Sequence, residues 1–504
     1  MRRRYSSWLR NAMGTDQSVF RTGTALPCAP RRARRREEPM SVRRSLLAGL
    51  LAASAAFAAD VVVVNADGPG VGFNDPTPAT PVGGNPGTTI GEQALNVFNE
   101  AARRWGAKLV SKQPIVVVAS FTGLPCSNTG AVLGGASPNW YFANVPAANG
   151  GQDLLPNTWY PAALAEKLTR QDIVADPNDT AEIFTVFNSN LGKPGCLPNS
   201  GWYYGLDNNQ PANRIDLLAV VLHEFGHGLG FVAGPTSAGN GARLLNFPSI
   251  WEYQMLDVST NKRWIDMTAV ERAASARNNL NLVWAGKYVT NVIPSVLDSA
   301  LALDVQSPSP LGISEVQPAA FGPPITLPVK GTVVAPNDGG GISLLDGCEP
   351  FPASANVAGN IVLVNRGNCT FVQKAQNAQG AGATALLVAN TTVAPFQAAA
   401  LGGVGPDIVI PSVGISGPLG NALRAANPPP VATLRRSPLL RTGTTAGYVR
   451  LYAPTAFSSG SSVSHFDVTA IPNLLMEPFI TADVGGSVKH PDDLTLSLLK
   501  DIGW

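Results

Sequence analysis

The sequence predicts an α+β fold in which a helix-and-strand domain is interrupted by a second domain. An amphipathic segment at 92–105 is followed by several strand-like runs, and then by a continuous apolar segment at 215–222 that predicts a buried helix. This order of helix, strands and helix indicates the α+β class. From about Phe321 to Thr433 the composition changes to Gly, Ala and Val with few charges, which indicates the inserted domain.

Length and composition are those of a globular protein with many loops. The 504 residues suffice for two large domains or about three average ones. With 14% charged residues, 51 glycines and 42 prolines, the chain is neither a coiled coil nor a disordered tail. Residues 1–58 hold 12 of the 36 basic and three of the 34 acidic residues, so the rest carries a net charge of −7. We therefore expect no nucleic-acid partner.

The first 58 residues are typical of a targeting leader. A basic stretch after Met40 precedes a short apolar run at 46–56, and Ala56-Phe57-Ala58 fits a cleavage site. We expect translation to start at Met40, with a signal peptide at 40–58. The apolar run is too short to span a bilayer, so we expect a secreted or periplasmic product without a stable membrane anchor. The alternative is that arginines at 31–36 form a functional basic patch.

Cysteine usage agrees with an oxidising compartment. Cys28 lies in the leader, which leaves an even set of four: Cys126, Cys196, Cys348 and Cys369. We expect two disulfides, for which three pairings exist. Nearness in sequence and separate domains favour Cys126–Cys196 and Cys348–Cys369. None of the four has CxxC spacing, which argues against a thiolate zinc site.

The first domain begins with a helix and continues with strands. Thr89 and Glu92 form a capping box, and the helix that follows places Leu95, Phe98, Ala102 and Trp105 on one face. The strand-like runs are 115–121, 140–145, 183–188 and 202–206. We expect them to serve as scaffold, although an edge strand such as 183–188 could pair with an extended substrate.

The segment HEFGHGLGF at 223–231 carries the strongest chemical signal. On a helix, His223 and His227 lie on one face and can reach one metal ion, and Glu224 can take a proton from a metal-bound water. Gly228 and Gly230 are expected to end the helix. Burying two imidazoles and a carboxylate without partners would be costly, which favours a zinc site.

A catalytic zinc site usually has three protein ligands and an open position for water. The chain has four histidines, so the third ligand is His465, His490 or an acidic residue. Glu252 and Glu271 are the acidic candidates, as in a gluzincin, although neither lies in an Asn-Glu-x-x-Ser-Asp context.

HExxHxxGF resembles the start of the metzincin signature, HExxHxxGxxH, whose third histidine would fall at Ala233. Leishmanolysin-type peptidases carry that histidine after a long insertion. Here His465 follows His227 by 238 residues, and Leu474-Leu475-Met476-Glu477-Pro478 resembles the Met-turn. The resemblance implies a twisted mixed sheet with an active-site helix, His465 as third ligand, and Met476 packed beneath the ligands without binding the metal.

The inserted stretch resembles the protease-associated (PA) domain. The similarity rests on Asp346-Gly347-Cys348, the buried strand at 361–365, the Arg-Gly-x-Cys-x-Phe turn at 366–371, and the Gly-Ala-x-Ala strand after 380. It implies a β-rich, non-catalytic module that restricts access or positions substrate. The expected domains are a leader at 1–58, catalytic segments at 59–320 and 436–504, and a PA domain at 321–435. The last segment ends in a helix from Leu494.

Together these features predict a secreted zinc endopeptidase that cleaves peptide bonds of protein substrates. His223, His227 and His465 would hold one Zn²⁺, and Glu224 would act as the general base. The competing hypothesis is an inactive secreted protein whose PA domain binds proteins, which the intact Glu224 argues against. A serine hydrolase lacks support because no Gly-x-Ser-x-Gly occurs. Calcium could bind among the many Asp and Asn loops, but no spacing assigns a site, and nothing predicts the oligomeric state.

Overall fold

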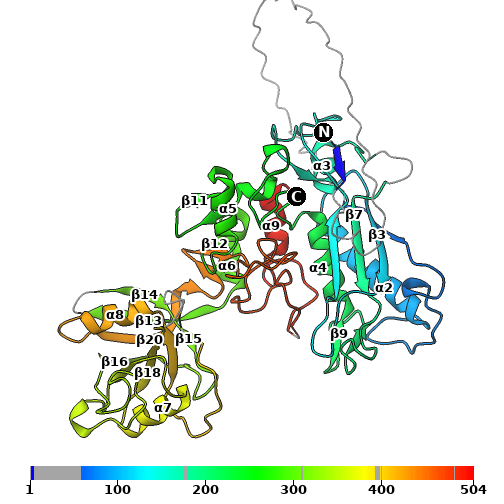
Figure 1. The fold of residues 1–504 in the computed structure, drawn as a ribbon. Helices are drawn as coiled ribbons and strands as arrows, with labels where there is room; N and C mark the ends of the chain where they lie inside the picture. The colour runs from blue at the N-terminus through cyan, green and yellow to red at the C-terminus, as the bar shows by residue number, and fades with distance from the viewer. Residues whose placement is uncertain are drawn as a thin grey trace, which may run out of the picture. The chain divides into compact units, whose positions relative to one another are not determined.

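The computed structural model describes residues 2–4, 58–174, 180–307, 310–391, 398, 400–481 and 483–504. The chain folds into two units (Figure 1). Unit 1 contains Met1–Val292, Arg450–Val468 and Asn473–Trp504, and unit 2 contains Ile293–Val449 and Thr469–Pro472. Cys28 and the expected signal peptide up to residue 57 lie outside the described residues.

The main sheet of unit 1 has four strands. Their order is β2 (Val61–Asn65), β3 (Ile115–Thr122), β7 (Ile183–Asn188) and β4 (Gly134–Pro138). β2, β3 and β7 are parallel and β4 is antiparallel to β7, so the sheet is mixed, as predicted. The strands predicted at 115–121 and 183–188 are confirmed.

The prediction that 183–188 is an edge strand is wrong. β7 pairs with β3 on one side and with β4 on the other. β4 has the sequence Gly-Gly-Ala-Ser-Pro, which lacks the β-branched and aromatic residues that indicate a strand. Among the described strands, the edge position on this side belongs to β4.

Helix α2 (Ile90–Gly106) begins at the predicted capping box. Thr89 Oγ1 accepts a hydrogen bond from Glu92 N, and Glu92 Oε2 accepts one from Thr89 N, both at 3.2 Å. Phe98 and Trp105 are fully buried, whereas Leu95 is half-buried. Trp105 Nε1 donates to Leu222 O at 3.1 Å, which ties α2 to α4 (Leu217–Leu229).

An aromatic cluster joins α2, the sheet and α4. The Phe98 ring centroid lies 4.7 Å from those of Phe73 and Phe187 and 6.1 Å from that of Phe225, each edge to face. Such pairs contribute about 0.5–1.5 kcal/mol each beyond burial of the rings. The cluster therefore fixes α4 against β7.

The remaining elements of unit 1 are short. They are β1 (Arg2–Arg4), β5 (Trp140–Phe142), β6 (Tyr160–Pro161), β8 (Gly201–Tyr203), β9 (Arg214–Asp216), β10 (Met255–Asp257), β11 (Lys262–Arg263), β12 (Leu282–Trp284), α3 (Ala162–Thr169), α5 (Ala269–Ser275) and α9 (Thr495–Ile502), with α6 (Lys287–Val296) crossing the unit boundary. The strand predicted at 140–145 stops at Phe142, before the left-handed Asn144 (φ 57°). The strand predicted at 202–206 ends at Tyr203, because its partner strand β9 is only three residues long.

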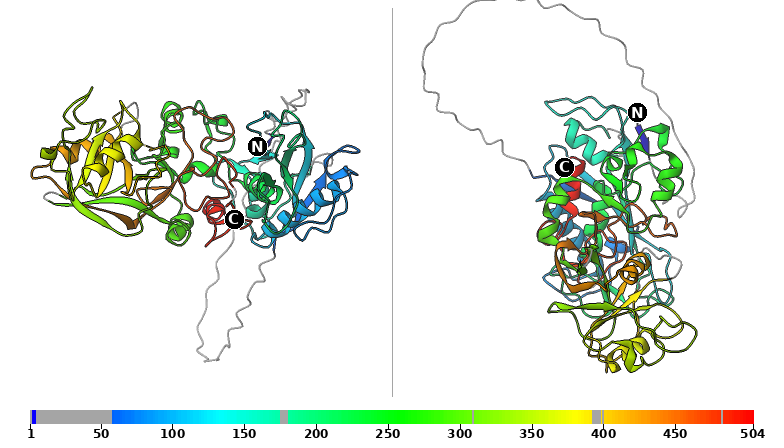
Figure 2. Two further views of the ribbon diagram at one scale, coloured as in Figure 1. Left: turned by 90° about the horizontal axis from the view of Figure 1, so that it is seen from below. Right: turned by 90° about the vertical axis from the view of Figure 1, so that its left-hand side faces the viewer.

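The C-terminal helix supports α4. α9, red in Figure 2, lies beside the end of α4, where Trp504 Nε1 donates to Leu229 O at 2.8 Å. Leu494, the predicted first residue of this helix, is its N-cap.

Two buried carboxyl groups meet between α3 and the start of β7. Glu166 and Glu182 are 2% and 3% exposed and share a hydrogen bond. Glu166 Oε1 also accepts from Ile173 N and Val174 N at 2.9 Å, and Glu182 Oε2 from Val116 N at 2.6 Å. Burial raises the pKa of Glu166 to about 7, and burial with the charge of Glu166 raises the pKa of Glu182 to about 8.

This pair predicts a pH-dependent stability. Because both folded-state pKa values lie above the ordinary 4.5, the protonated pair stabilises the fold below pH 4.5, and that stability is lost as pH rises through 7–8. Between pH 5 and pH 9, the free energy of unfolding of Glu182→Gln should rise by about 2 kcal/mol relative to that of the parent, as measured by urea unfolding. The exposed Asp60→Asn should show no such gain, and parallel pH profiles for parent and Glu182→Gln would refute the prediction.

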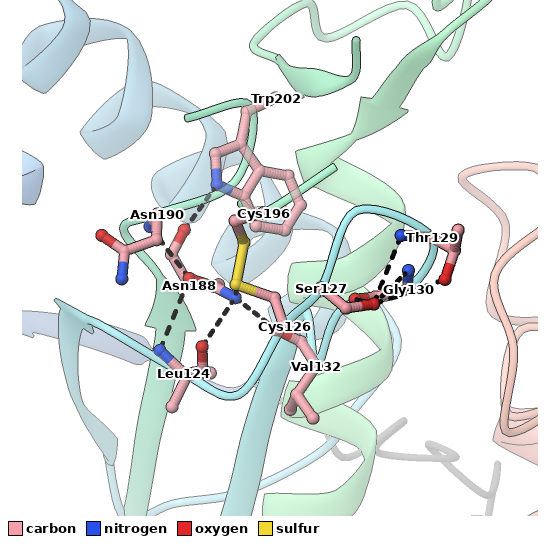
Figure 3. The surroundings of a disulfide bond; sticks show 10 residues. All are labelled: Leu124, Cys126, Ser127, Thr129, Gly130, Val132, Asn188, Asn190, Cys196 and Trp202. Carbon is pink, nitrogen blue, oxygen red and sulfur yellow. Dashed lines mark hydrogen bonds between the residues drawn. A yellow bond between two sulfur atoms is a disulfide. The ribbon is translucent and has the colours of Figure 1, made fainter. Parts of the chain in front are cut away.

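Both expected disulfides are present, Cys126–Cys196 and Cys348–Cys369. Figure 3 shows the first beside the buried Asn188 at the end of β7. Asn188 Nδ2 donates to Val132 O at 2.8 Å, and Trp202 Nε1 donates to Asn188 O at 3.0 Å. The disulfide and these hydrogen bonds hold the loops after β3 and β7 together.

Unit 2 is organised around an eight-stranded mixed sheet. Its order is β14 (Gly312–Glu315), β13 (Ser299–Ser307), β20 (Val431–Arg441), β16 (Val329–Val334), β17 (Ile361–Asn365), β18 (Ala385–Ala389), β19 (Ser412–Ile415) and β15 (Gln317–Pro318). Unit 2 also contains the helices α7 (Phe371–Gly380) and α8 (Gly417–Ala425) and the short strand β21 (Thr444–Thr445). Strand β22 (Tyr448–Arg450) crosses the unit boundary.

The central strands of unit 2 are buried on both faces. Ile361 and Leu363 of β17 lie in one hydrophobic cluster, and Val362 and Val364 lie in another. This explains the unbroken apolar runs, which are typical of parallel strands covered on both sides. Unit 2 begins before residue 321 because β13 pairs along its length with β20.

In the part of the chain that the structure describes, no helix is both long enough and apolar enough to cross a membrane.

Candidate metal centre

Helix α4 carries the HEFGH segment, and its ends are well defined. Asp216 is the N-cap, and its Oδ1 accepts from Leu218 N at 2.9 Å. Gly230 (φ 120°) is the C-cap, where Phe231 N donates to Gly226 O at 3.0 Å. Gly228 lies within the helix, where a Cβ would come 2.3 Å from Ile183 Cγ2, so glycine lets α4 pack closely on β7. The helix thus ends at Gly230 and not at Gly228.

Three histidine side chains meet at one point. His227 Nε2 lies 3.0 Å from His223 Nε2 and 3.2 Å from His465 Nε2. His223 and His227 come from α4, and His465 comes from a segment 238 residues further along the chain. His490 is exposed and lies outside this cluster.

The opposite ring nitrogen of each histidine is held by a backbone carbonyl. His223 Nδ1 donates to Leu475 O at 2.7 Å, His227 Nδ1 to Phe231 O at 2.7 Å, and His465 Nδ1 to Ser461 O at 2.8 Å. Because a carbonyl oxygen can only accept, each Nδ1 carries the proton. The unprotonated Nε2 atoms therefore face one another.

This arrangement fits a zinc ion. Three facing lone pairs repel unless a cation lies among them, and burial opposes protonation. Burial lowers the pKa of His223 to about 4, that of His227 to about 3, and that of His465 well below 6.5. Nitrogen atoms that both bind one Zn²⁺ at about 2.0–2.1 Å are about 3.0–3.4 Å apart. Carbonyl partners on the far nitrogens are also typical of histidine metal ligands.

Glu224 follows His223 directly on α4 and is 6% exposed. Burial raises its pKa to about 8. A Cβ on Gly134, the first residue of β4, would lie 3.1 Å from Glu224 Oε1, so the edge strand approaches this carboxyl group closely. Sequence reasoning missed β4 and hence this contact.

His465 is positioned by the segment that contains Leu451. Leu451 and Phe466 form an antiparallel bridge, and Tyr452 N donates to His465 O at 2.9 Å. The adjacent Ser464 Oγ accepts from Ala233 N at 3.1 Å. The distant histidine segment therefore packs against the position where the short metzincin signature carries its third histidine.

Met476 follows Leu475, whose carbonyl holds His223, and is fully buried. A Cβ on Gly226 would come 2.8 Å from Met476 Sδ, so the thioether packs directly on α4. Met476 O accepts from Phe466 N at 2.9 Å, which links this turn to the His465 segment.

Asp493 supports the turn, and sequence reasoning missed it. Its Oδ2 accepts from Leu475 N at 2.7 Å, and Leu475 O in turn holds His223. Its Oδ1 accepts from Thr495 N at 2.7 Å at the start of α9. An Asp just before an apolar helical segment is a helix-start signal that could have revealed it.

The alternative acidic ligands have other partners. Glu252 is fully buried and pairs with Arg243 at 2.7 Å, while its Oε1 accepts from Thr236 Oγ1. Glu271 caps α5 through Thr268 and pairs with Lys262. Neither belongs to the histidine cluster.

The PA domain family matches residues 329–423, which confirms the predicted PA domain. A stretch of 46 residues is 48% identical to Signal peptide peptidase-like 4 of Oryza sativa subsp. japonica, covering 9% of this chain and 8% of that protein. Signal peptide peptidase-like 2 of Arabidopsis thaliana is 49% identical over 45 residues, with the same shares. The chain thus spans 8% of the length of these curated relatives.

Among solved structures, BSAP, a zinc aminopeptidase from Bacillus subtilis, is similar over 28% of this chain and 31% of its own, with 25% identity and a TM-score of 0.22. An aminopeptidase from Aneurinibacillus sp. strain AM-1 shows 23% identity over the same shares, with a TM-score of 0.21. TM-scores this low do not indicate a shared overall fold. The PA match lies within unit 2 and does not include the histidine cluster.

Proposed function

We propose that the chain is a secreted zinc-dependent endopeptidase with a metzincin-like catalytic domain and a PA domain inserted at about 321–435. The observation that carries the proposal is the convergence of three unprotonated Nε2 atoms, with 3.0 and 3.2 Å from His227 to the other two, and with Glu224 next to His223 on the same helix.

In this proposal His223, His227 and His465 hold Zn²⁺ through Nε2. When bound, zinc supplies a Lewis acid that polarises a peptide carbonyl and makes a nearby water acidic. Glu224 accepts the proton of that water and passes it to the nitrogen of the leaving amine. Met476 and the carbonyls of Leu475, Phe231 and Ser461 keep the imidazoles in position.

Strand β4 offers a surface for an extended substrate. It is the outer strand on its side of the described sheet, and Gly134 lies against Glu224. A peptide that pairs with a strand edge through its backbone needs no free terminus. Such pairing would bring an internal peptide bond toward Glu224, which favours cleavage within a chain.

Metal analysis combined with a proteolysis assay tests the proposal. We expect one zinc ion per chain, and cleavage of peptides blocked at both ends that stops with 1,10-phenanthroline and returns with added zinc. Cleavage of peptides with a free amino terminus alone would contradict the endopeptidase assignment. Bound zinc without cleavage of any peptide library would favour a catalytically inactive secreted protein that binds proteins through its PA domain.

A further inference from the structure

A second group of metal-ligating side chains lies in unit 2. Asp338, Asp346 and Glu349 each offer a carboxylate oxygen, and these oxygens lie within 4.8 Å of one another. Asp338 and Asp346 are 2% and 1% exposed, and Glu349 is half-buried. Three carboxylates this close together, two of them buried, repel one another unless a cation or a shared proton compensates.

Asp338 is the side chain that most needs a partner. Its Oδ1 and Oδ2 are both buried without a hydrogen-bond donor among the described residues, as is Glu349 Oε2. Asp346 differs, because its Oδ1 accepts from Cys348 N at 3.0 Å and its Oδ2 accepts from Asn368 Nδ2. A buried carboxylate without a donor is strongly destabilising, so the orphaned oxygens point to a ligand.

The ammonium group of Lys374 donates to backbone carbonyls and a sulfur, and not to the carboxylates. Lys374 is fully buried, and its Nζ donates to Asp346 O at 2.6 Å and to Gly367 O at 2.7 Å, with Cys348 Sγ at 3.3 Å. Two carbonyls and a sulfur thus use its three N–H groups. Three ionised carboxylates and one ammonium leave a net charge of −2, which one divalent cation would neutralise.

The loop between the acids allows close approach to a carboxylate. Gly339 and Gly341 have φ values of +84° and +76°. A Cβ on Gly341 would lie 2.3 Å from Glu349 Oε1, so the backbone of this loop runs close to the carboxylate, and the positive φ of Gly341 favours glycine there. Asn337 Oδ1 accepts from Gly339 N at 2.7 Å and fixes the turn.

We propose that Asp338, Asp346 and Glu349 bind one calcium ion within the PA domain. Calcium takes about 6–8 oxygen ligands at about 2.3–2.6 Å, so two oxygens bound to one ion are up to about 5 Å apart, a limit that the three carboxylate oxygens meet. Zinc fits poorly, because none of the chain's four histidines lies in unit 2 and Cys348 is in a disulfide.

Titration of the full chain with CaCl₂ in calcium-free buffer tests the site. We expect calorimetry to show binding with a Kd of roughly 10⁻⁵–10⁻³ M and calcium to raise the unfolding temperature. Asp338→Asn and Glu349→Gln should each lower the affinity at least about 10-fold and remove one ion from the stoichiometry. Asp407→Asn, at an exposed acid of the same unit, should bind calcium like the parent.

Three results would overturn the proposal. The first is no calcium binding up to about 10 mM, well above the expected Kd. The second is equal binding by the parent and both variants. The third is a shared proton in place of an ion, in which case Asp338→Asn unfolds at a higher temperature than its parent and calcium affects neither. If Asp338→Asn fails to fold, the calcium titration of Glu349→Gln, at a half-buried position, tests the proposal in its place. No readout depends on peptidase activity, so the test is independent of the proposed function.

Discussion

Replacing Glu224 with glutamine is expected to lower peptide hydrolysis by about 10²–10⁴-fold and to leave the zinc content unchanged. Glutamine has nearly the same volume, so α4 keeps its packing, but an amide cannot accept the proton of the attacking water. Glu224 is not a ligand in the proposed site, because the three Nε2 atoms form the cluster. The measurements are kcat/KM for a blocked fluorogenic peptide and zinc per chain.

Glu166→Gln is the matched control, since Glu166 is also a buried acid of unit 1 but lies outside the histidine cluster. It should retain both zinc and hydrolysis. Hydrolysis by Glu224→Gln at the parental rate would eliminate Glu224 as general base. Loss of zinc from Glu224→Gln would show that the carboxyl group contributes to metal binding.

His465→Ala is expected to release zinc and abolish hydrolysis. Two imidazoles on α4 remain, which is one protein ligand short of a catalytic zinc site. Removing a metal ligand should lower zinc affinity more than removing a group that is hydrogen-bonded to a ligand. We therefore expect at least about a 100-fold loss of zinc affinity. Competition with a chromophoric chelator measures this affinity.

His490→Ala separates the two candidate ligands. His490 is exposed and outside the cluster, so its removal should leave zinc affinity and kcat/KM unchanged. Zinc retained in His465→Ala together with zinc lost from His490→Ala would reverse the ligand assignment.

The local parts of the candidate site could be predicted because their signal lies in adjacent residues. The spacing of His223 and His227 places both on one face of a helix, and an unbroken apolar run predicts that the helix is buried. The strands of the PA domain could be predicted equally well, because parallel strands that are covered on both faces have continuous apolar sequences.

The non-local parts were harder to predict. His465 came from a family resemblance and from the scarcity of histidines, because no local pattern connects it to α4. β4 was missed because Gly-Gly-Ala-Ser-Pro has low strand propensity, and its pairing with β7 supplies the structure that its sequence does not indicate. Asp493 was missed because its role depends on a backbone amide 18 residues earlier in the chain.

The separation of His227 and His465 by 238 residues has a consequence for when the site forms during biosynthesis. The three imidazoles cannot meet until the whole inserted unit has been synthesised. At about 5–20 residues per second, the delay after His227 is on the order of 10–50 s. Throughout that interval the growing chain has only the two histidines of α4. A peptidase organised in this way would acquire its activity only after the inserted unit and the segment with His465 have been synthesised.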